Sequence, residues 1–381
     1  MHENNESFKD QKARVRKAAV AGDDFPYEEL DEPVLYKFYL WCIWRIEKSK
    51  NKNDPRIPAD LKKSLRKESF ELIRYIDKGG QGDVYEAKHL LQGTQVSSCA
   101  IKILKNSNFD SCFAEVKKMD SIEGEYIVKL CPPFLINLDK KKMALVMELV
   151  DGHSLYDYIR DEEKLTVLQI LRIMKQICEG MKVAAEKKVN HRDLKPSNIL
   201  IKDGSHRVVL IDFGLASYSI ENPLPAKPNL SIRAGTGHWV APEQAKNLTA
   251  ADEKSDIYGL GATMYYVVTG KIPFAQLSLD EVWKLKKAAK PIEEMANLPE
   301  PSTLNSEVKG KLNDLIMKCL QTDPARRPGT FEEVIDAIEE IKQDLDWKSR
   351  RESYADLDKA KTPEEGRKAI DAAYEKGRAV G

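Results

Sequence analysis

The hydrophobic pattern changes period near residue 155, and this change limits the fold more than any other feature. Before it, runs such as FELIRYI (70–76) and MALVMELV (143–150) are typical of strands. After it, apolar residues recur with helical spacing, as in 166–187 and 255–270. Strands are expected over 70–76, 82–90, 97–105, 126–130 and 143–150, with one helix among them near 109–122. The pattern predicts an α+β fold with a small sheet lobe and a larger helical lobe.

The length of 381 residues favours two or three folding units, because single hydrophobic cores stop growing at about 250–300 residues. Residues 1–68 are interpreted as an N-terminal extension with an aromatic helix and a charged linker. The alternating strands and helices occupy 69–345, with the small lobe over 69–150 and the large lobe over 151–345. Residues 346–381 form a charged helical tail.

Charge and cysteine content exclude several classes of protein. The chain has 61 Lys and Arg against 61 Asp and Glu, so a nucleic-acid partner is not expected. Its six cysteines show no CxxC pair and no zinc spacing, which is typical of reduced thiols. The polar N-terminus, MHENNESFKD, lacks an apolar signal. These features favour the cytoplasm.

An aromatic segment over 33–48 is the most apolar part of the extension. Its core is shorter than the ~20 residues that a bilayer requires and contains Lys37 and Arg45, so no membrane span is expected. Two interpretations stay open. The helix either docks a partner or regulates the lobes, or it packs on the chain's own domain.

A loop rich in ionisable residues, VNHRDLKPSNILI (189–201), lies between apolar runs. AIK precedes it at 100–102, and DFG (212–214), APE (241–243) and DPARRP (323–328) follow it. In this order the motifs resemble the eukaryotic-type (Hanks-type) serine/threonine protein kinases, and bacterial cytoplasmic members in particular. The resemblance implies the bilobal protein kinase fold and an ATP-dependent kinase that acts on protein substrates.

The resemblance assigns catalytic and metal roles around the loop. Phosphoryl transfer from ATP depends on positioning and on neutralising negative charge. Asp193 is expected to orient the substrate hydroxyl and take its proton, and Lys195 to meet the transferred phosphate, as in the serine/threonine class. Asn198 and Asp212 are the expected ligands of Mg²⁺.

Strand alternation can send Lys102 inward together with Ala100. A buried ammonium is costly unless it is paired, and the resemblance implies Glu115 as its partner. Together the two side chains are expected to hold the α- and β-phosphates of ATP.

The glycine loop departs from the family pattern, because Asp77 stands where the family has its first glycine. Gly79, Gly80 and Gly82 still allow the backbone to approach phosphates. A plain hairpin turn is the alternative interpretation.

The adenine pocket is implied by resemblance alone. Its expected members are Val84 and Ala100 above the base, Leu200 below it, Met147 at the back, the backbone of Glu148 and Val150 at the adenine edge, and Ser154 near the ribose.

Regulation is expected in the segment after DFG. Ser231 and Thr236 are candidates for autophosphorylation, with Arg192 as the anchor for the phosphate. Mass spectrometry that finds an active enzyme without phosphate in this segment would contradict the hypothesis.

Four further residues are given structural roles. Glu243 and Arg327 are expected to form a buried pair, and Asp256 to hold the backbone of the catalytic loop. His191 is interpreted as a packing histidine without a chemical role.

Two other functions compete with a protein kinase. A small-molecule kinase of related fold would lack the segment around Ala241–Glu243 and the lysine at 195. A pseudokinase that serves as a scaffold would agree with the altered residue at 77, but the five expected active-site residues are all present.

Overall fold

The structure is a computed structural model that describes residues 54–79, 82–105, 109–139, 142–161, 165–213, 237–247, 251–289 and 298–358. The predicted helix over 33–48, Gly80, and the candidates Ser231 and Thr236 lie outside these residues. The described chain divides into two compact units. One contains the residues up to Phe109 together with Leu130–Leu149, and the other contains Asp110–Lys129 and the residues from Val150 onward.

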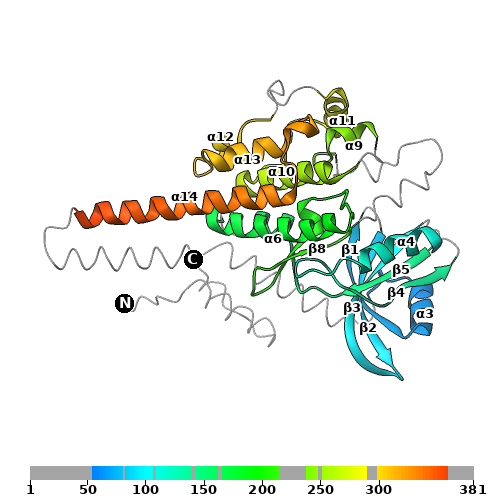
Figure 1. The fold of residues 1–381 in the computed structure, drawn as a ribbon. Coiled ribbons are helices and arrows are strands. Elements are labelled where there is room, and N and C mark those ends of the chain that lie inside the picture. The colour runs from blue at the N-terminus through cyan, green and yellow to red at the C-terminus, as the bar shows by residue number, and fades with distance from the viewer. Residues whose placement is uncertain are drawn as a thin grey trace, which may run out of the picture. The chain divides into compact units, whose positions relative to one another are not determined.

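The first unit is built on a five-stranded antiparallel sheet (Figure 1). Its strands are β1 (Phe70–Gly79), β2 (Gly82–Leu91), β3 (Thr94–Lys105), β4 (Leu130–Asp139) and β5 (Lys142–Glu148). They are ordered β1-β2-β3-β5-β4. A strand-rich first unit before a helical second unit confirms the predicted α+β fold.

The prediction of a strand over 126–130 is wrong. Within that range, the strand β4 starts only at the last residue, and Ile127 forms an isolated bridge with Leu210. Strand β4 contains Pro132 and Pro133, which make a strand unexpected there, because proline has no N–H to donate to the neighbouring strand. They are tolerated because β4 is an edge strand.

A helix stands where the sequence favoured a linker. Helix α3 (Ala59–Lys67) buries Leu61 and Leu65, and these side chains join Ile57 in the core of the first unit with residues of the sheet. The many charged residues of this segment indicated a linker, but most of them lie on the exposed side of the helix, opposite Leu61 and Leu65. Residues 57–67 are therefore part of the folded unit.

The segment before α3 is fixed by an ionic cluster. Arg56 donates two hydrogen bonds to the buried carboxylate of Asp54, at 2.8 and 2.6 Å, and its guanidinium lies 4.7 Å from the centre of the Tyr75 ring. The backbone N–H of Tyr75 also donates to Asp54 at 3.1 Å. The Arg56 hydrogen bond holds the pKa of Asp54 well below its usual value despite burial.

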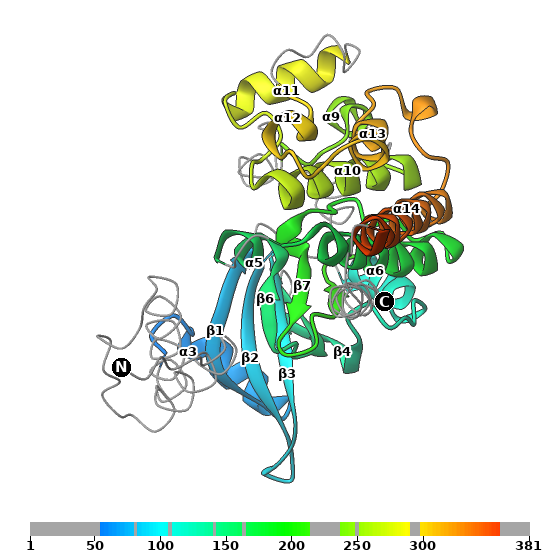
Figure 2. The ribbon, with the colours of Figure 1, turned by 90° about the vertical axis from the view of Figure 1, so that its left-hand side faces the viewer.

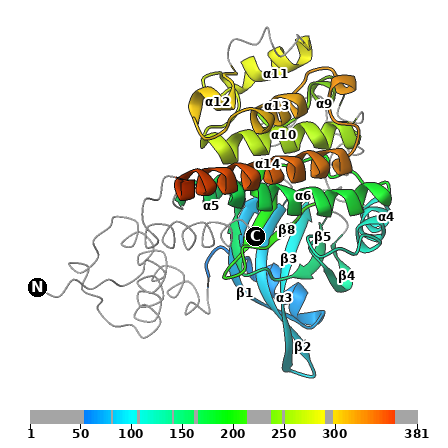
Figure 3. The same cartoon turned by 60° about the vertical axis from the view of Figure 1, so that its left-hand side comes forward.

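The second unit is mainly helical. Its helices are α4 (Phe109–Asp120), α5 (Leu155–Asp161), α6 (Val167–Glu186), α9 (Pro242–Lys246), α10 (Glu253–Thr269), α11 (Leu279–Ala288), α12 (Pro301–Leu304), α13 (Lys311–Cys319) and α14 (Phe331–Asp358). Helix α10 is buried from Ser255 to Val268. It lies between α13 and α6, and α14 runs along α6 (Figures 2 and 3). The helices predicted near 109–122 and over 166–187 and 255–270 are confirmed as α4, α6 and α10.

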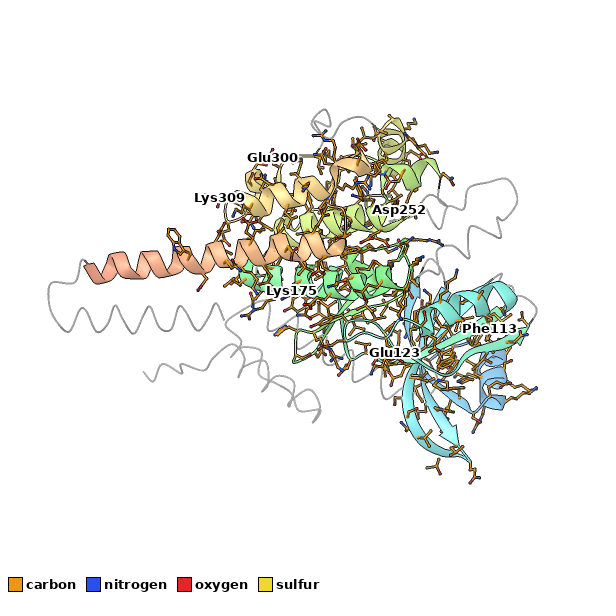
Figure 4. The ribbon with its side chains drawn as sticks, in the orientation of Figure 1. Phe113, Glu123, Lys175, Asp252, Glu300 and Lys309 are labelled. Carbon is orange, nitrogen blue, oxygen red and sulfur yellow. The ribbon has the colours of Figure 1, made fainter. Side chains whose placement is uncertain are left out.

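Local sequence signals set the ends of these helices. Thr166 and Gln169 form a capping box at the start of α6. Asp252 caps α10, which ends at Gly270 with a φ of 67°. Lys175 on α6 (Figure 4) forms an ion pair of 2.7 Å with Glu339 on α14. Helix α14 continues past residue 346, at which the tail was expected to begin, and ends at Asp358.

A small antiparallel sheet adjoins the polar loop (189–198) of the second unit. It consists of β6 (Gly152–Ser154), β7 (Ile199–Lys202) and β8 (Val208–Leu210). A 3₁₀ turn over Pro196–Asn198 leads directly into β7. Within the described chain, every helix is too short or too polar to cross a membrane.

Candidate active site

Two polar side chains of the loop, those of Lys195 and Asn198, converge on Asp193. Lys195 Nζ donates to Asp193 Oδ2 at 2.7 Å, and Asn198 Nδ2 donates to the same oxygen at 3.0 Å and to the Asp193 carbonyl at 2.8 Å. The 3₁₀ turn makes this possible by folding Asn198 back, with its N–H on the Lys195 carbonyl at 2.9 Å. Asp193 Oδ1 is buried and accepts no hydrogen bond from any described group. One carboxylate oxygen of Asp193 thus has no hydrogen-bond donor among the described groups.

Strand pairing places Asn198 and Asp212 at the same ends of β7 and β8. Ile199 is opposite Leu210, and the N–H of Ile211 donates to the Asn198 carbonyl at 3.0 Å. Asp212 then adopts a φ of 67°, which is uncommon for a residue with a side chain. Oxygen donors of this kind are the ligands that Mg²⁺ prefers. The described residues contain no cluster of three or more His, Cys, Asp or Glu that could hold a metal.

His191 lies beneath the loop as a packing residue. Its ring is buried against Phe213, with ring centres 4.6 Å apart, and Nε2 lies 2.9 Å from the Ile211 carbonyl. Because a carbonyl only accepts, Nε2 carries the proton. Burial lowers the pKa of His191, which favours the neutral ring. The predicted structural role is confirmed.

Asp256 holds the loop backbone, as predicted. Its two oxygens accept the N–H groups of His191 and Arg192, each at 2.7 Å. Burial raises the pKa of Asp256 to about 7, although both hydrogen bonds act in the opposite direction. Gln244 donates to the Arg192 carbonyl at 3.1 Å. Arg192 has a φ of 67°, and these contacts on both sides keep it in that conformation.

Glu243 and Arg327 form the predicted buried pair. Arg327 donates from Nη1 and Nη2 to the two Glu243 oxygens at 2.6 and 2.8 Å. Burial raises the pKa of Glu243, but the Arg327 hydrogen bond and charge more than offset it, so the pKa lies below its ordinary value. The pair joins the start of α9 to the turn before α14.

Lys102 lies on β3 of the first unit and is 1% exposed. It is opposite Val84 on β2 and Leu145 on β5, and Ala100, two residues away, is opposite Met147. The predicted inward direction of Lys102 is confirmed by this burial. Glu115 lies on α4, but its side chain is outside the described set, so the pairing stays a prediction.

The glycine loop closes the β1–β2 hairpin, in which Gly79 is opposite Gly82. A Cβ at Gly82 would lie 2.1 Å from the Ile103 carbonyl oxygen, so only glycine fits there. Asp77 follows an irregularity in the β1 register and is opposite Val84. The hairpin is therefore present, which leaves the phosphate role of the glycines as a prediction.

Comparison with known proteins decides the family. The family model for the protein kinase domain matches residues 70–342. The chain belongs to this family. A probable serine/threonine-protein kinase of Clostridium perfringens is 34% identical over 282 residues, which cover 72% of this chain and 38% of the relative.

Two further relatives agree with this assignment. Sperm motility kinase 3A of Mus musculus is 31% identical over 271 residues, covering 70% of this chain and 49% of the relative. The probable serine/threonine-protein kinase PknB of Lactococcus lactis is 29% identical over 271 residues, covering 70% and 41%. The kinase domain thus matches less than half the length of each of these three relatives.

The predicted adenine contacts of this kinase domain are placed in part. Ser154 is opposite Leu200 in the small sheet, so these two candidates are neighbours. The Ser154 hydroxyl donates to Asp157 at 2.7 Å and accepts the Asp157 N–H at 3.1 Å, which fixes it at the start of α5. Strand β5 ends at Glu148, two residues before the end of the strand expected over 143–150. The contacts themselves, including that of Val150, stay predictions.

Sequence reasoning missed two residues that fix the kinase domain's loops. Gln244 directly follows the Ala-Pro-Glu motif, and its contact with Arg192 spans 52 residues. Lys286 on α11 is fully buried and donates to two backbone carbonyls of the segment before that motif. Neither residue had a signal in the sequence, because a glutamine and one lysine of several in a charged helix are ordinary there.

Proposed function

We propose that this kinase domain transfers the γ-phosphate of ATP to serine and threonine hydroxyls of proteins. The observation that carries the proposal is the cluster of Lys195 and Asn198 around Asp193, with one buried oxygen of Asp193 left without a hydrogen bond in the described chain. A substrate hydroxyl can donate to that oxygen and so be oriented for transfer.

Each polar residue of the site has a separate role in this proposal. Asp193 accepts the hydroxyl proton as the new bond to phosphorus forms. Lys195 brings a compact positive charge beside Asp193 to meet the transferred phosphate. Asn198 and Asp212 would hold Mg²⁺, which neutralises charge on the phosphates when it is bound. The strained backbone of Asp212 is typical of residues held in place for function.

The first unit contributes nucleotide binding in this proposal. Lys102, paired with Glu115, holds the α- and β-phosphates, and Gly79, Gly80 and Gly82 cover them. Val84, Ala100, Met147 and Glu148 are the proposed adenine contacts of the first unit. Val150 and Leu200 are those of the second unit, in which Ser154 is the proposed ribose contact. The inward direction of Lys102 beside Ala100 supports this arrangement.

Two observations favour a protein kinase over the alternatives. The fixed Ala241–Glu243 segment, tied to Arg327 and through Gln244 to the loop, argues against a small-molecule kinase. The intact polar cluster around Asp193 argues against a pseudokinase.

The test uses the full chain, labelled ATP, magnesium and generic serine or threonine protein substrates. The wild type is expected to label them, and Asp193→Asn to lower the rate by about 10²–10⁴-fold while still binding nucleotide. An unlabelled substrate with the wild type, or an equally active Asp193→Asn, would contradict the proposal. Nucleotide binding without transfer would identify a pseudokinase.

Autophosphorylation of Ser231 or Thr236 is part of the same proposal. Arg192 Nε is buried and has no hydrogen-bond partner among the described groups. A phosphate oxygen can accept a hydrogen bond from this N–H, which supports Arg192 as the anchor for the phosphate. Full activity without phosphate on either residue in mass spectra would refute this role. A cytoplasmic location and docking through residues 33–48 are further proposals that rest on the sequence.

A further inference from the structure

Asp54 lies outside the matched kinase domain, yet it contacts the strand that leads into the glycine loop. It precedes residue 70, at which the match begins, and it is 6% exposed. Its carboxylate accepts three hydrogen bonds from Arg56, one from the backbone N–H at 3.0 Å and two from the guanidinium at 2.8 and 2.6 Å. A fourth comes from the backbone N–H of Tyr75 at 3.1 Å. The carboxylate is therefore fixed in place on all sides that these donors occupy.

Strand β1 benefits from such a contact because it is an edge strand. In the described chain, β2 is its one neighbour in the five-stranded sheet. The N–H groups on the open side of an edge strand have no second strand to bind. Asp54 supplies an acceptor from outside the sheet, and a hydrogen bond to a charged group is stronger than one between neutral groups.

This contact falls next to an irregularity in the strand. The register of β1 on β2 shifts between Tyr75 and Asp77, and the pairing then continues to Gly79, which is opposite Gly82. A shift of this kind bends and twists a strand, so it decides in which direction the following residues run. Asp54 thus holds β1 at the last pair before the irregularity, and the glycine loop follows a few residues later.

The side chain of Tyr75 is held as well as its backbone. The guanidinium of Arg56 lies 4.7 Å from the centre of the Tyr75 ring, where a cation is attracted to the aromatic face. The ring of Tyr85 on β2 meets the Tyr75 ring edge-on, with centres 5.5 Å apart. Tyr75 is therefore fixed between the segment before α3 and the neighbouring strand.

Asp54 is itself connected to a well-packed part of the unit. The N–H of Ile57 donates to the Asp54 carbonyl at 3.1 Å, and Ile57 is buried with Leu65 of α3 in the core of the sheet. Helix α3 lies beside β1 (Figure 2). A group that is supported by packed elements holds its partner more precisely than one on an unsupported loop. Asp54 can therefore keep β1 in one position.

Of the two strands of the glycine hairpin, β2 is already fixed by the sheet. It lies between β1 and β3, and a Cβ at Gly82 would lie 2.1 Å from the Ile103 carbonyl oxygen. The position of Gly79 relative to Gly82 thus depends on β1, and Asp54 is the group that holds β1 from outside the sheet.

We propose that Asp54 is a positioning residue for ATP, which fixes β1 at Tyr75 so that Gly79 and Gly82 lie where the phosphates approach them. The inference rests on the proposed function, in which these glycines cover the phosphates. It gives the segment before the matched kinase domain a role in nucleotide affinity and none in binding the polypeptide.

The test compares Asp54→Ala with Asp60→Ala in the full chain. The side chain of Asp60, on α3, is 73% exposed, so this control removes the same charge without the contact to Tyr75. Asp54→Ala is expected to raise the Kd for ATP with magnesium about tenfold in calorimetry, because hydrogen bonds to a charged group are lost. The Kd for adenosine, which has no phosphates, is expected to stay within about twofold. Asp60→Ala is expected to match the wild type for both ligands.

Leu65→Ala separates this role from a general loss of stability. Leu65 packs in the same core, so its truncation destabilises the first unit without removing the hydrogen bond to Tyr75. At a temperature at which all variants are folded, Leu65→Ala is expected to bind ATP and adenosine within about twofold of the wild type. Asp54→Asn, which is uncharged and of similar size, is expected to weaken ATP binding in the same direction as Asp54→Ala. It provides the comparison if the alanine variant does not fold.

Hydrogen–deuterium exchange gives a readout that does not depend on a ligand. In Asp54→Ala the amides of 75–79 are expected to exchange about tenfold faster or more, with β3 and β5 unchanged. An unchanged Kd for ATP, an equal loss for ATP and adenosine, an equal loss in Leu65→Ala, or unchanged exchange at 75–79 would each overturn the role of Asp54.

The two proposals can fail separately. A wild type that binds no ATP contradicts the proposed function, and exchange at 75–79 then still decides whether Asp54 holds β1. A wild type that phosphorylates proteins, while Asp54→Ala binds ATP equally well, contradicts only the role of Asp54.

Discussion

Arg327 donates two parallel hydrogen bonds to Glu243 across 84 residues of chain, and its side chain has no exposure to solvent. Arg327 also donates to the carbonyls of Gln321, Thr322 and Lys254, which leaves it fully enclosed. The pair therefore connects α9, which contains Glu243, to the turn between α13 and α14, which contains Arg327.

Removing both partners of this pair is expected to cost less than the sum of the two single removals. Glu243→Ala leaves a buried guanidinium without its counter-charge and is expected to lower the free energy of unfolding by about 3–5 kcal/mol. The double variant Glu243→Ala/Arg327→Ala should lose less than the sum of the two single variants. Urea unfolding of all four chains measures the coupling, and additive losses would show that the two side chains act independently.

The raised pKa of Asp256 predicts a pH dependence of stability. The ordinary aspartate pKa is 3.8, whereas in the fold it is about 7. Between these values the folded chain holds a proton that the unfolded chain has released. The contribution of Asp256 to the free energy of unfolding is thus fully present below pH about 4 and is lost as pH rises through about 7.

Asp256→Asn tests this directly. The variant is expected to be less stable, since one backbone N–H loses its acceptor, and to lack the part of the pH dependence between about 4 and 7 that Asp256 supplies. Urea unfolding at several pH values measures it, with the exposed Asp336→Asn as the control. An Asp256→Asn chain with the wild-type pH profile would contradict the assigned pKa.

Helix α3 is expected to stabilise the first unit although it precedes the matched kinase domain. Leu65 is fully buried in the core that also contains Ile101 and Ile103, which flank Lys102 on β3. Leu65→Ala should therefore cost about 2–5 kcal/mol in urea unfolding. Lys63→Ala, on the exposed side of the same helix, should change stability by less than about 0.5 kcal/mol. Equal effects of the two would mean that α3 does not pack as described.

Gly82→Ala is expected to disturb the hairpin of the nucleotide loop. The new Cβ meets the Ile103 carbonyl, a backbone atom that cannot turn aside, so β2 must shift at a cost of about 1–3 kcal/mol. If Gly82 covers the phosphates as proposed, affinity for an ATP analogue falls with it in calorimetry.

Gly93→Ala, in the turn between β2 and β3, is the control for that variant. Its Cβ meets no atom within 4 Å, but its φ of 82° still costs about 1 kcal/mol. Nucleotide affinity is expected to be unchanged. Weaker binding in both variants would point to a general loss of stability instead of a local effect at Gly82.

The sequence by itself determined the local structure and the chemistry of the loop. Helical periodicity gave α6 and α10, because the pattern that buries one face of a helix is written over consecutive residues. The roles expected for Asp193 and Asn198 needed only five residues of chain, and the turn between them brings their side chains together.

Only the tertiary structure decided which residues far apart in the sequence come into contact within each unit. The contact of Asp54 with Tyr75, the packing of Leu65 under β3, and the hydrogen bonds of Lys286 join residues that no short pattern relates. Burial also decides the protonation state of Asp256, since its pKa depends on the residues that other segments pack around it. The local sequence pattern indicates which secondary structure each segment prefers. The free energy of burying a polar group depends instead on the partners that the whole fold brings to it.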